Sequence, residues 1–125
     1  MTSRQASYPH ETAVTAYGNG GFRFADMSHK GSILCLPSGV YAWNAGSAGA
    51  LTVEHFAQVL SELVPPALVL LGTGTEQIFV PPAIEKVFVD AGLTLEPMST
   101  GAAARSYNIL LAEKRKVAAA LIAVA

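Results

Sequence analysis

Two glycine-rich segments carry the residues of this sequence that are best suited to chemistry. Gly72-Thr73-Gly74-Thr75 follows an apolar run at 67–71, and Ser99-Thr100-Gly101 follows a shorter run at 93–95. Glycines let a ligand approach the backbone closely, and a helix that begins at Ser99 or Thr100 would offer unpaired N–H groups to an anion. Arg105, about one turn into that helix, could add a bidentate cation. The candidate ligand-binding residues are Gly72, Thr73, Gly74, Ser99, Thr100, Gly101, Arg105 and Asn108.

The residues of this candidate site predict that the ligand is an anion, but they do not predict which anion. A phosphate, a carboxylate or an acidic side chain of a partner would fit them. A dinucleotide fingerprint requires G-x-G-x-x-G directly before a helix, whereas position 77 is Gln and the next helix begins only after Pro82. No Gly-Lys-Ser/Thr sequence follows, which argues against a phosphate-binding P-loop. In the alternative interpretation, the glycines form turns and close packing, and Arg105 pairs with a carboxylate of this chain.

No set of residues points to catalysis or to metal binding. Asp26, Ser28 and His29 are the residue types of a hydrolase triad, but triad members normally converge from separate elements, so we expect a solvated turn here. The other histidines, His10 and His55, lack the paired ligands at short spacing that metal sites usually show. We therefore expect no catalytic residue, no metal and no cofactor.

The first half of the chain is expected to supply antiparallel strands. Residues 1–12 are polar and patternless, which predicts a loose tail before a single domain at 13–125. Short apolar runs joined by glycine-rich or proline-containing turns predict successive antiparallel strands. These runs lie at 13–17, 22–24, 32–36 and 40–43.

The second half alternates helices and strands. Thr52 is expected to be the N-cap of a helix that ends before Pro65. The spacing of one helical face is followed by Phe56, Val59, Leu60 and Leu63. Gly92 stands where a left-handed residue ends a further helix. We expect helices at 52–63 and 84–91, a helix from Ser99 or Thr100 to near Lys114, and strands at 67–71, 93–95 and 117–124. Such alternation predicts parallel strands, and open parallel sheets bind ligands at the carboxyl ends of their strands.

The high share of hydrophobic residues raises the question of whether a partner covers part of the surface. Hydrophobic residues make up 51% of the 125 residues and charged residues 14%, against about 25% charged residues in an average protein. The excess reflects either alanine and buried sheet or an apolar surface that a partner covers. Tyr41 and Trp43 are expected in the core or at its edge, and the alternative is an exposed Trp43 that anchors a partner.

Charge, the length of the apolar runs and cysteine content indicate which partners and which compartment to expect. The net charge is −1, with no basic face of the kind that nucleic-acid binding requires, so we expect no nucleic acid. The apolar run at 117–125 is shorter than the roughly twenty residues of a membrane span, so we expect no stable membrane insertion. The single cysteine, Cys35, lies in an apolar run and is expected to be a small buried core residue. With no signal-like N-terminus, these features favour the cytoplasm.

Three segments together resemble a known family. They are the stretch at 98–121, the Gly72-Thr73-Gly74 loop followed by Pro81-Pro82, and Pro37-Ser38-Gly39-Val40 ahead of Trp43. The sequence is similar over most of 13–124 to the family that includes mitochondrial complex I assembly factor 3 and an adipogenesis-associated domain protein. Ser106 stands where threonine is expected, which keeps the hydroxyl. The resemblance implies a three-layer β/β/α fold and protein partners, and it supplies no catalytic residues.

These observations favour a single-domain α/β protein with a binding or assembly role and no enzymatic activity. Its partner would be another protein or a second copy of the chain. The alternative is a small-molecule enzyme or anion-binding protein that uses the loop at 72–74 and the helix start at 100–105.

Overall fold

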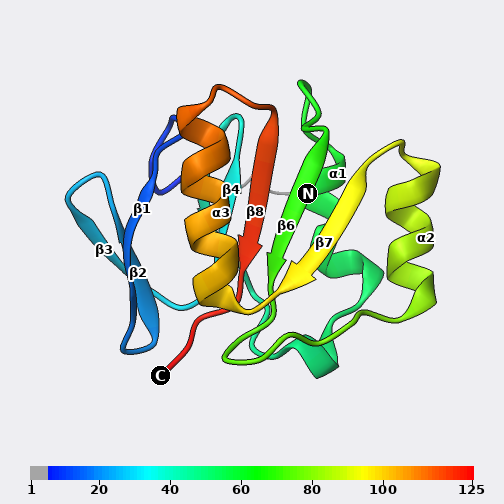
Figure 1. The fold of residues 1–125 in the computed structure, drawn as a ribbon, viewed down its shortest axis with the longest axis horizontal. Coiled ribbons are helices and arrows are strands. Elements are labelled where there is room, and N and C mark those ends of the chain that lie inside the picture. The colour runs from blue at the N-terminus through cyan, green and yellow to red at the C-terminus, as the bar shows by residue number, and fades with distance from the viewer. Residues whose placement is uncertain (1–5) are drawn as a thin grey trace.

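A computed structural model describes residues 6–125 of the chain. The first half forms a three-stranded antiparallel sheet in the order β1-β2-β3 (Figure 1). Its strands are β1 (Val14–Gly18), β2 (Gly21–Phe24) and β3 (Met27–Lys30). Both of its turns place their two central residues at positive φ, as tight hairpins require. These residues are Asn19, Gly20, Ala25 and Asp26.

The strand β3 corrects the expectation of a solvated turn at Asp26, Ser28 and His29. Only Ala25 and Asp26 form the turn, and Ser28 and His29 lie in β3, paired with β2. The sequence did not predict this strand, because its residues, Met-Ser-His-Lys, do not alternate clearly between apolar and polar types.

The second half, together with a β4–β5 hairpin, builds a five-stranded sheet in the order β5-β4-β8-β6-β7. As expected, β6, β7 and β8 are parallel and β4 runs antiparallel to β5. The structure adds an antiparallel pairing of β4 with β8, which the sequence did not predict. The strands are β4 (Ile33–Leu36), β5 (Gly39–Ala42), β6 (Leu68–Gly72), β7 (Thr94–Met98) and β8 (Val117–Leu121). Every residue of the central β8 is buried, because the sheet is covered on both faces.

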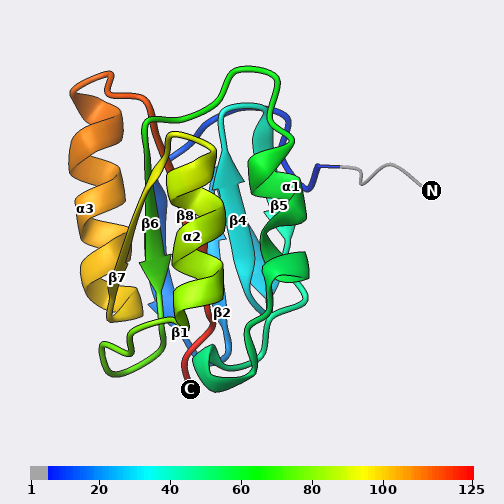
Figure 2. The same ribbon diagram turned by 90° about the vertical axis from the view of Figure 1, so that its right-hand side faces the viewer.

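The layers confirm the expected β/β/α arrangement. The helix α3 (Thr100–Ala112) and the three-stranded sheet cover one face of the larger sheet, while α1 (Ala57–Leu60) and α2 (Pro82–Asp90) lie on the other (Figure 2). On the first face, Phe22 and Phe24 pack with Tyr107 of α3. On the second, Trp43 packs beside Phe56, so Trp43 belongs to the core and is not an exposed anchor.

The bounds of three predicted elements differ most from those in the structure. The helix expected at 52–63 is a 3₁₀ helix (η2, Val53–Phe56) followed by the single turn α1, and Leu63 is 99% exposed. The Ser61 hydroxyl bonds the Gln58 carbonyl oxygen at 3.0 Å, and Pro65 disfavours helix in the residue before it, so the helix ends early. The strand at 93–95 extends to Met98, whereas the closing strand stops at Leu121.

The predicted tail lies partly outside the described residues. Within them, the Ser7 N–H donates to the Val40 carbonyl oxygen at 2.8 Å, and the Val40 N–H donates to the Tyr8 carbonyl oxygen at 2.9 Å. The division into a tail at 1–12 and a domain at 13–125 stays a prediction. Between residues 6 and 125, no helix is both long enough and apolar enough to cross a membrane.

Candidate functional site

The two glycine-rich segments meet at the carboxyl edge of β6 and β7. Gly72 pairs with Met98 at the ends of these parallel strands. The Thr73 N–H donates to the Met98 carbonyl oxygen at 2.8 Å, and the Thr100 N–H donates to the Gly74 carbonyl oxygen at 2.8 Å. Two loops that lie far apart in the sequence therefore form one surface beside the start of α3.

The glycines of this surface have structural roles. A β-carbon on Gly72 would lie 2.9 Å from the Thr100 Cα atom and 3.0 Å from the Leu121 Cδ2 atom, so only glycine lets α3 approach β6 this closely. Gly74 has a φ of 110°, which side chains rarely allow. Both glycines thus shape the backbone of the chain itself.

The threonine hydroxyls of the site are used inside the protein. Thr73 is buried, and its Oγ1 atom lies within hydrogen-bonding distance of the Glu76 and Met98 carbonyl oxygens and accepts from the Ile78 N–H at 3.1 Å. Thr100 is fully buried, and its Oγ1 atom donates to the Ile122 carbonyl oxygen at 2.7 Å and accepts from the Gly74 N–H at 3.0 Å. These bonds fix the loop backbone.

Ser99 and Asn108 also bond within the chain. The Ser99 side chain caps α3 by accepting from the Ala102 N–H at 3.4 Å. The Asn108 side-chain amide donates to the Val14 carbonyl oxygen at 2.7 Å and accepts from the Val14 N–H at 2.9 Å. Asn108 therefore fastens β1 to α3, and its amide group is not turned toward the loops.

Arg105 is the charged side chain of the predicted site, and it is exposed on α3. Among residues 6–125, no carboxylate forms an ion pair with it. A β-carbon on Gly101 would overlap the Tyr17 hydroxyl oxygen and would lie 3.4 Å from the Arg105 Nη1 atom. Tyr17, Gly101 and Arg105 therefore lie together. The sequence does not indicate Tyr17 as a neighbour of this site, because Tyr17 lies on β1 and nothing in its local pattern predicts contact with α3.

The loop between β6 and α2 exposes apolar side chains. Ile78 is 44% exposed and Phe79 is 76% exposed. The loop is held in place by Thr73 and by Gln77, whose Nε2 atom donates to the Pro97 carbonyl oxygen at 2.9 Å. The loop is therefore held by bonds of Thr73 and Gln77 and exposes two neighbouring apolar side chains.

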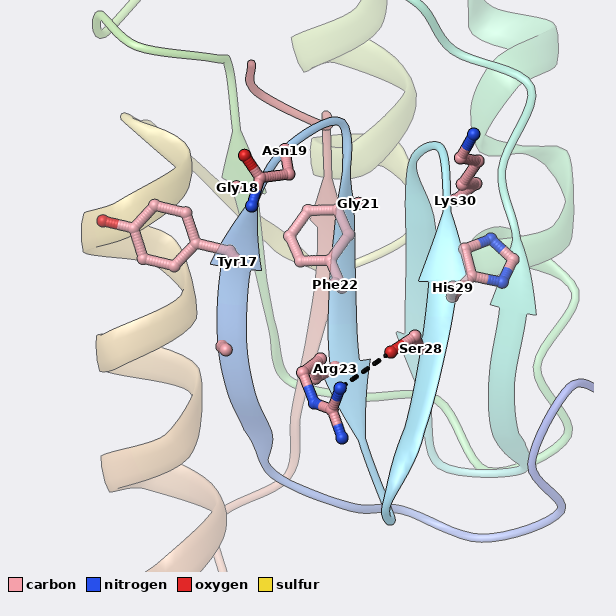
Figure 3. A pocket seen from close by; sticks show the side chains of 10 residues that line it. Tyr17, Gly18, Asn19, Gly21, Phe22, Arg23, Ser28, His29 and Lys30 are labelled. Carbon is pink, nitrogen blue, oxygen red and sulfur yellow. Dashed lines mark hydrogen bonds between the residues drawn. The ribbon is translucent and has the colours of Figure 1, made fainter.

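A hollow of about 310 Å³ lies on the three-stranded sheet, and no pattern in the sequence predicts it. Small residues, including Gly18 and Gly21, leave room for it, and Arg23 and Lys30 supply positive charge. Figure 3 shows the Arg23 side chain reaching from β2 to Ser28 of β3, where its Nη1 atom donates to the Ser28 Oγ atom at 3.0 Å.

The buried titratable groups do not resemble activated nucleophiles. Cys35 is fully buried, and burial raises the pKa of its thiol to about 12, which keeps it protonated. Burial, followed by the neighbouring Cys35 and Glu11, holds the pKa of Tyr107 well above its ordinary value. Within the described part of the chain, no three His, Cys, Asp or Glu side chains gather into a group that could hold a metal ion.

Comparisons with known proteins agree with this fold. An uncharacterized protein from Rhodobacter capsulatus is 32% identical over 122 residues, which cover 98% of this chain and 93% of that protein. A crystal structure described as an outer membrane protein from Bartonella henselae is similar with a TM-score of 0.90 and 45% identity, covering 94% of this chain and 99% of that one.

A further relative links the chain to assembly factors. NADH dehydrogenase (ubiquinone) 1 alpha subcomplex assembly factor 3 from Mus musculus is 29% identical over 120 residues. The match covers 94% of this chain and 64% of the mouse protein. It confirms the resemblance noted from the segments around residues 37, 72 and 98–121. The family model described as "Protein of unknown function (DUF498/DUF598)" matches residues 14–122, and the chain belongs to that family.

Proposed function

We propose that this chain is a protein-binding protein with an assembly-type role and that the loop between β6 and α2 contacts its partner. One observation carries the proposal. The Thr73 and Gln77 side chains hold the loop by bonds within the chain, while Ile78 and Phe79 are exposed. Exposed apolar side chains are often buried against another protein. Because internal hydrogen bonds already order this loop, binding would cost little conformational entropy.

The relatives support the same class of function. The mouse relative is named as an assembly factor, and we infer from that name that this chain binds other proteins. We propose the cytoplasm as the compartment, which is consistent with the single, free and buried Cys35.

A pull-down from the source cell tests this proposal. Tagged wild-type chain is compared with the double variant Ile78→Ser/Phe79→Ser, and bound proteins are identified by mass spectrometry. Val89→Ser is the matched control, because Val89 is 65% exposed on α2 and outside the loop. We expect a stoichiometric partner with the wild-type and Val89→Ser chains and its loss with the double variant. Recovery of the chain alone, or equal recovery of the partner by all three, would contradict the proposal.

A second candidate function is anion binding beside Arg105. The exposed guanidinium has no carboxylate partner among residues 6–125, and it lies next to Gly101 and the Tyr17 hydroxyl at the start of α3. Titration with inorganic phosphate, followed by the amide resonances of residues 100–105, tests it. Saturable shifts in the wild-type chain that vanish in Arg105→Ala would support an anion site. Absent shifts, or shifts that are the same in the variant, would contradict anion binding beside Arg105.

A further inference from the structure

The strand β3 has the least obstructed sheet edge among residues 6–125. The edge of β1 is occupied at Val14 by the Asn108 amide. The edge of β5 is occupied at Val40 by Tyr8. The edge strand β7 contains Pro97, which has no N–H to offer. β3 pairs with β2 on one side, and no other strand of the described chain pairs with it on the other.

The register shows which groups of β3 face outward. The Gly31 N–H donates to the Gly20 carbonyl oxygen at 2.8 Å, and Phe22 lies opposite His29. Because bonded and non-bonded pairs alternate along an antiparallel ladder, His29 and Met27 direct their backbone groups to β2. The backbone N–H and C=O groups of Ser28 and Lys30 therefore point to the open edge.

The side chains beside this edge define the chemistry of the strand that fits it. Ser28 and Lys30 lie on the outer face with Arg23, and the residues that line the hollow there include no carboxylate. Met27, on the other face, is 37% exposed. An added strand would place alternate residues beside Arg23 and Lys30 and the residues between them beside Met27.

We propose that the β3 edge binds an extended segment of a partner protein in which acidic and apolar residues alternate. The inference rests on the proposed protein-binding function and names the chemistry of the partner. Backbone bonds at Ser28 and Lys30 would hold the segment, and acidic side chains over Arg23 and Lys30 would select it. A lysine on an edge strand deters neutral or basic strands, so the edge is selective as well as open.

A second copy of the chain is a poorer occupant. Antiparallel pairing of two β3 edges through Ser28 and Lys30 would place Lys30 of each copy opposite Ser28 of the other. The two Lys30 side chains would then share one face with two Arg23 side chains and no carboxylate among them. Like charges at such cross-strand positions are destabilising.

A tethered strand tests the proposal with the full chain. The Gly20 N–H donates to the Val124 carbonyl oxygen at 2.8 Å, so the end of the described chain lies near Gly20 and Gly31, close to β3. A segment of alternating Val and Glu is fused after Ala125 through a Gly/Ser linker, which supplies it at about millimolar effective concentration. The matched control carries Val and Lys. Amide hydrogen exchange is measured for Ser28 and Lys30, with the internally bonded Met27 and His29 as references.

We expect the Val–Glu fusion to slow exchange at Ser28 and Lys30 by about tenfold or more, and the Val–Lys fusion to leave it unchanged. Ser28→Pro removes an outward N–H without breaking the ladder to β2 and should abolish the protection at Lys30, whereas Ser28→Ala should keep it. Arg23→Glu with Lys30→Glu should reverse the preference between the two fusions. This reversal does not depend on a proline being tolerated.

Other outcomes would overturn the proposal. Equal exchange in both fusions would remove it. Protection at Ser28 and Lys30 in the unfused chain that grows with protein concentration would assign the edge to a second copy. The exchange experiment and the pull-down can fail independently. The pull-down can show a partner that is lost only with Ile78→Ser/Phe79→Ser while the β3 edge stays unprotected from exchange. Conversely, a protected edge can coexist with a pull-down that recovers no partner.

Discussion

Asn108 binds both backbone groups of Val14, across 94 positions of sequence, and so joins the helix α3 to the first strand. Asn108→Ala leaves the N–H and C=O groups of Val14 without these partners in a half-buried place. We expect the free energy of unfolding to fall by about 1–3 kcal/mol, measured by urea denaturation. Ile109→Ala, at an exposed neighbouring position, should cost clearly less. Equal losses in the two variants would contradict the role assigned to Asn108.

Gly72 sets the distance between β6 and α3. A methyl group there would meet the Thr100 Cα and Leu121 Cδ2 atoms at 2.9 and 3.0 Å, so Gly72→Ala should destabilise the fold by about 1–3 kcal/mol through overpacking. Gly49→Ala is the control, since nothing lies within 4 Å of its added carbon. Thermal unfolding of both variants checks the prediction, which fails if Gly72→Ala is as stable as Gly49→Ala.

Thr100 contributes through its hydroxyl. Thr100→Val keeps the shape but leaves the buried Ile122 carbonyl oxygen and Gly74 N–H without their partner. We expect a loss of about 1–3 kcal/mol in the free energy of unfolding. Thr75→Val, at an exposed position of the same loop, should change stability by no more than about 0.5 kcal/mol. Similar denaturation midpoints for the two variants would show that the Thr100 hydroxyl is not needed to hold the loop.

Cys35 should make stability fall at alkaline pH. Its pKa rises from 9.0 to about 12 on burial, so above pH 9 the unfolded chain releases a proton that the folded chain keeps. The unfolded state then binds fewer protons, and the free energy of unfolding decreases as pH rises, by at most about 1.4 kcal/mol per pH unit. Urea denaturation between pH 9 and 10, below the ordinary pKa of Tyr107 at 10.0, should show this slope in the wild-type chain. A Cys35→Ala chain with the same slope would contradict it.

The parallel half of the fold could be predicted because its sequence patterns are strong. The apolar run before Gly72, the helical spacing of Ile84 and Phe88, and Gly92 with a φ of 76° all have the structures that their patterns indicate. The pattern failed at Leu63, which has the right spacing for a buried helical face but lies beyond the point where the helix ends. Periodicity cannot show where hydrogen-bond competition and a following proline stop a helix.

The candidate site was predictable in its location but not in its detail. The carboxyl ends of parallel strands had to bring the loops after β6 and β7 together. The bonds from Thr100 to Ile122 and from Asn108 to Val14 join distant residues, so no local pattern reveals that these polar groups are occupied. The contact between Tyr17 and Gly101 was not predictable for the same reason, since these residues are also far apart in the sequence.

Photo-crosslinking from position 79 tests whether the β6–α2 loop binds another protein. A photoreactive phenylalanine analogue replaces Phe79 in one chain and Val89 in another, and both chains are irradiated in the source cell. Both side chains are exposed, so the two probes sample solvent alike. We expect one defined covalent adduct with a second protein from position 79 and none from position 89. No adduct from position 79, or the same adducts from both positions, would contradict it.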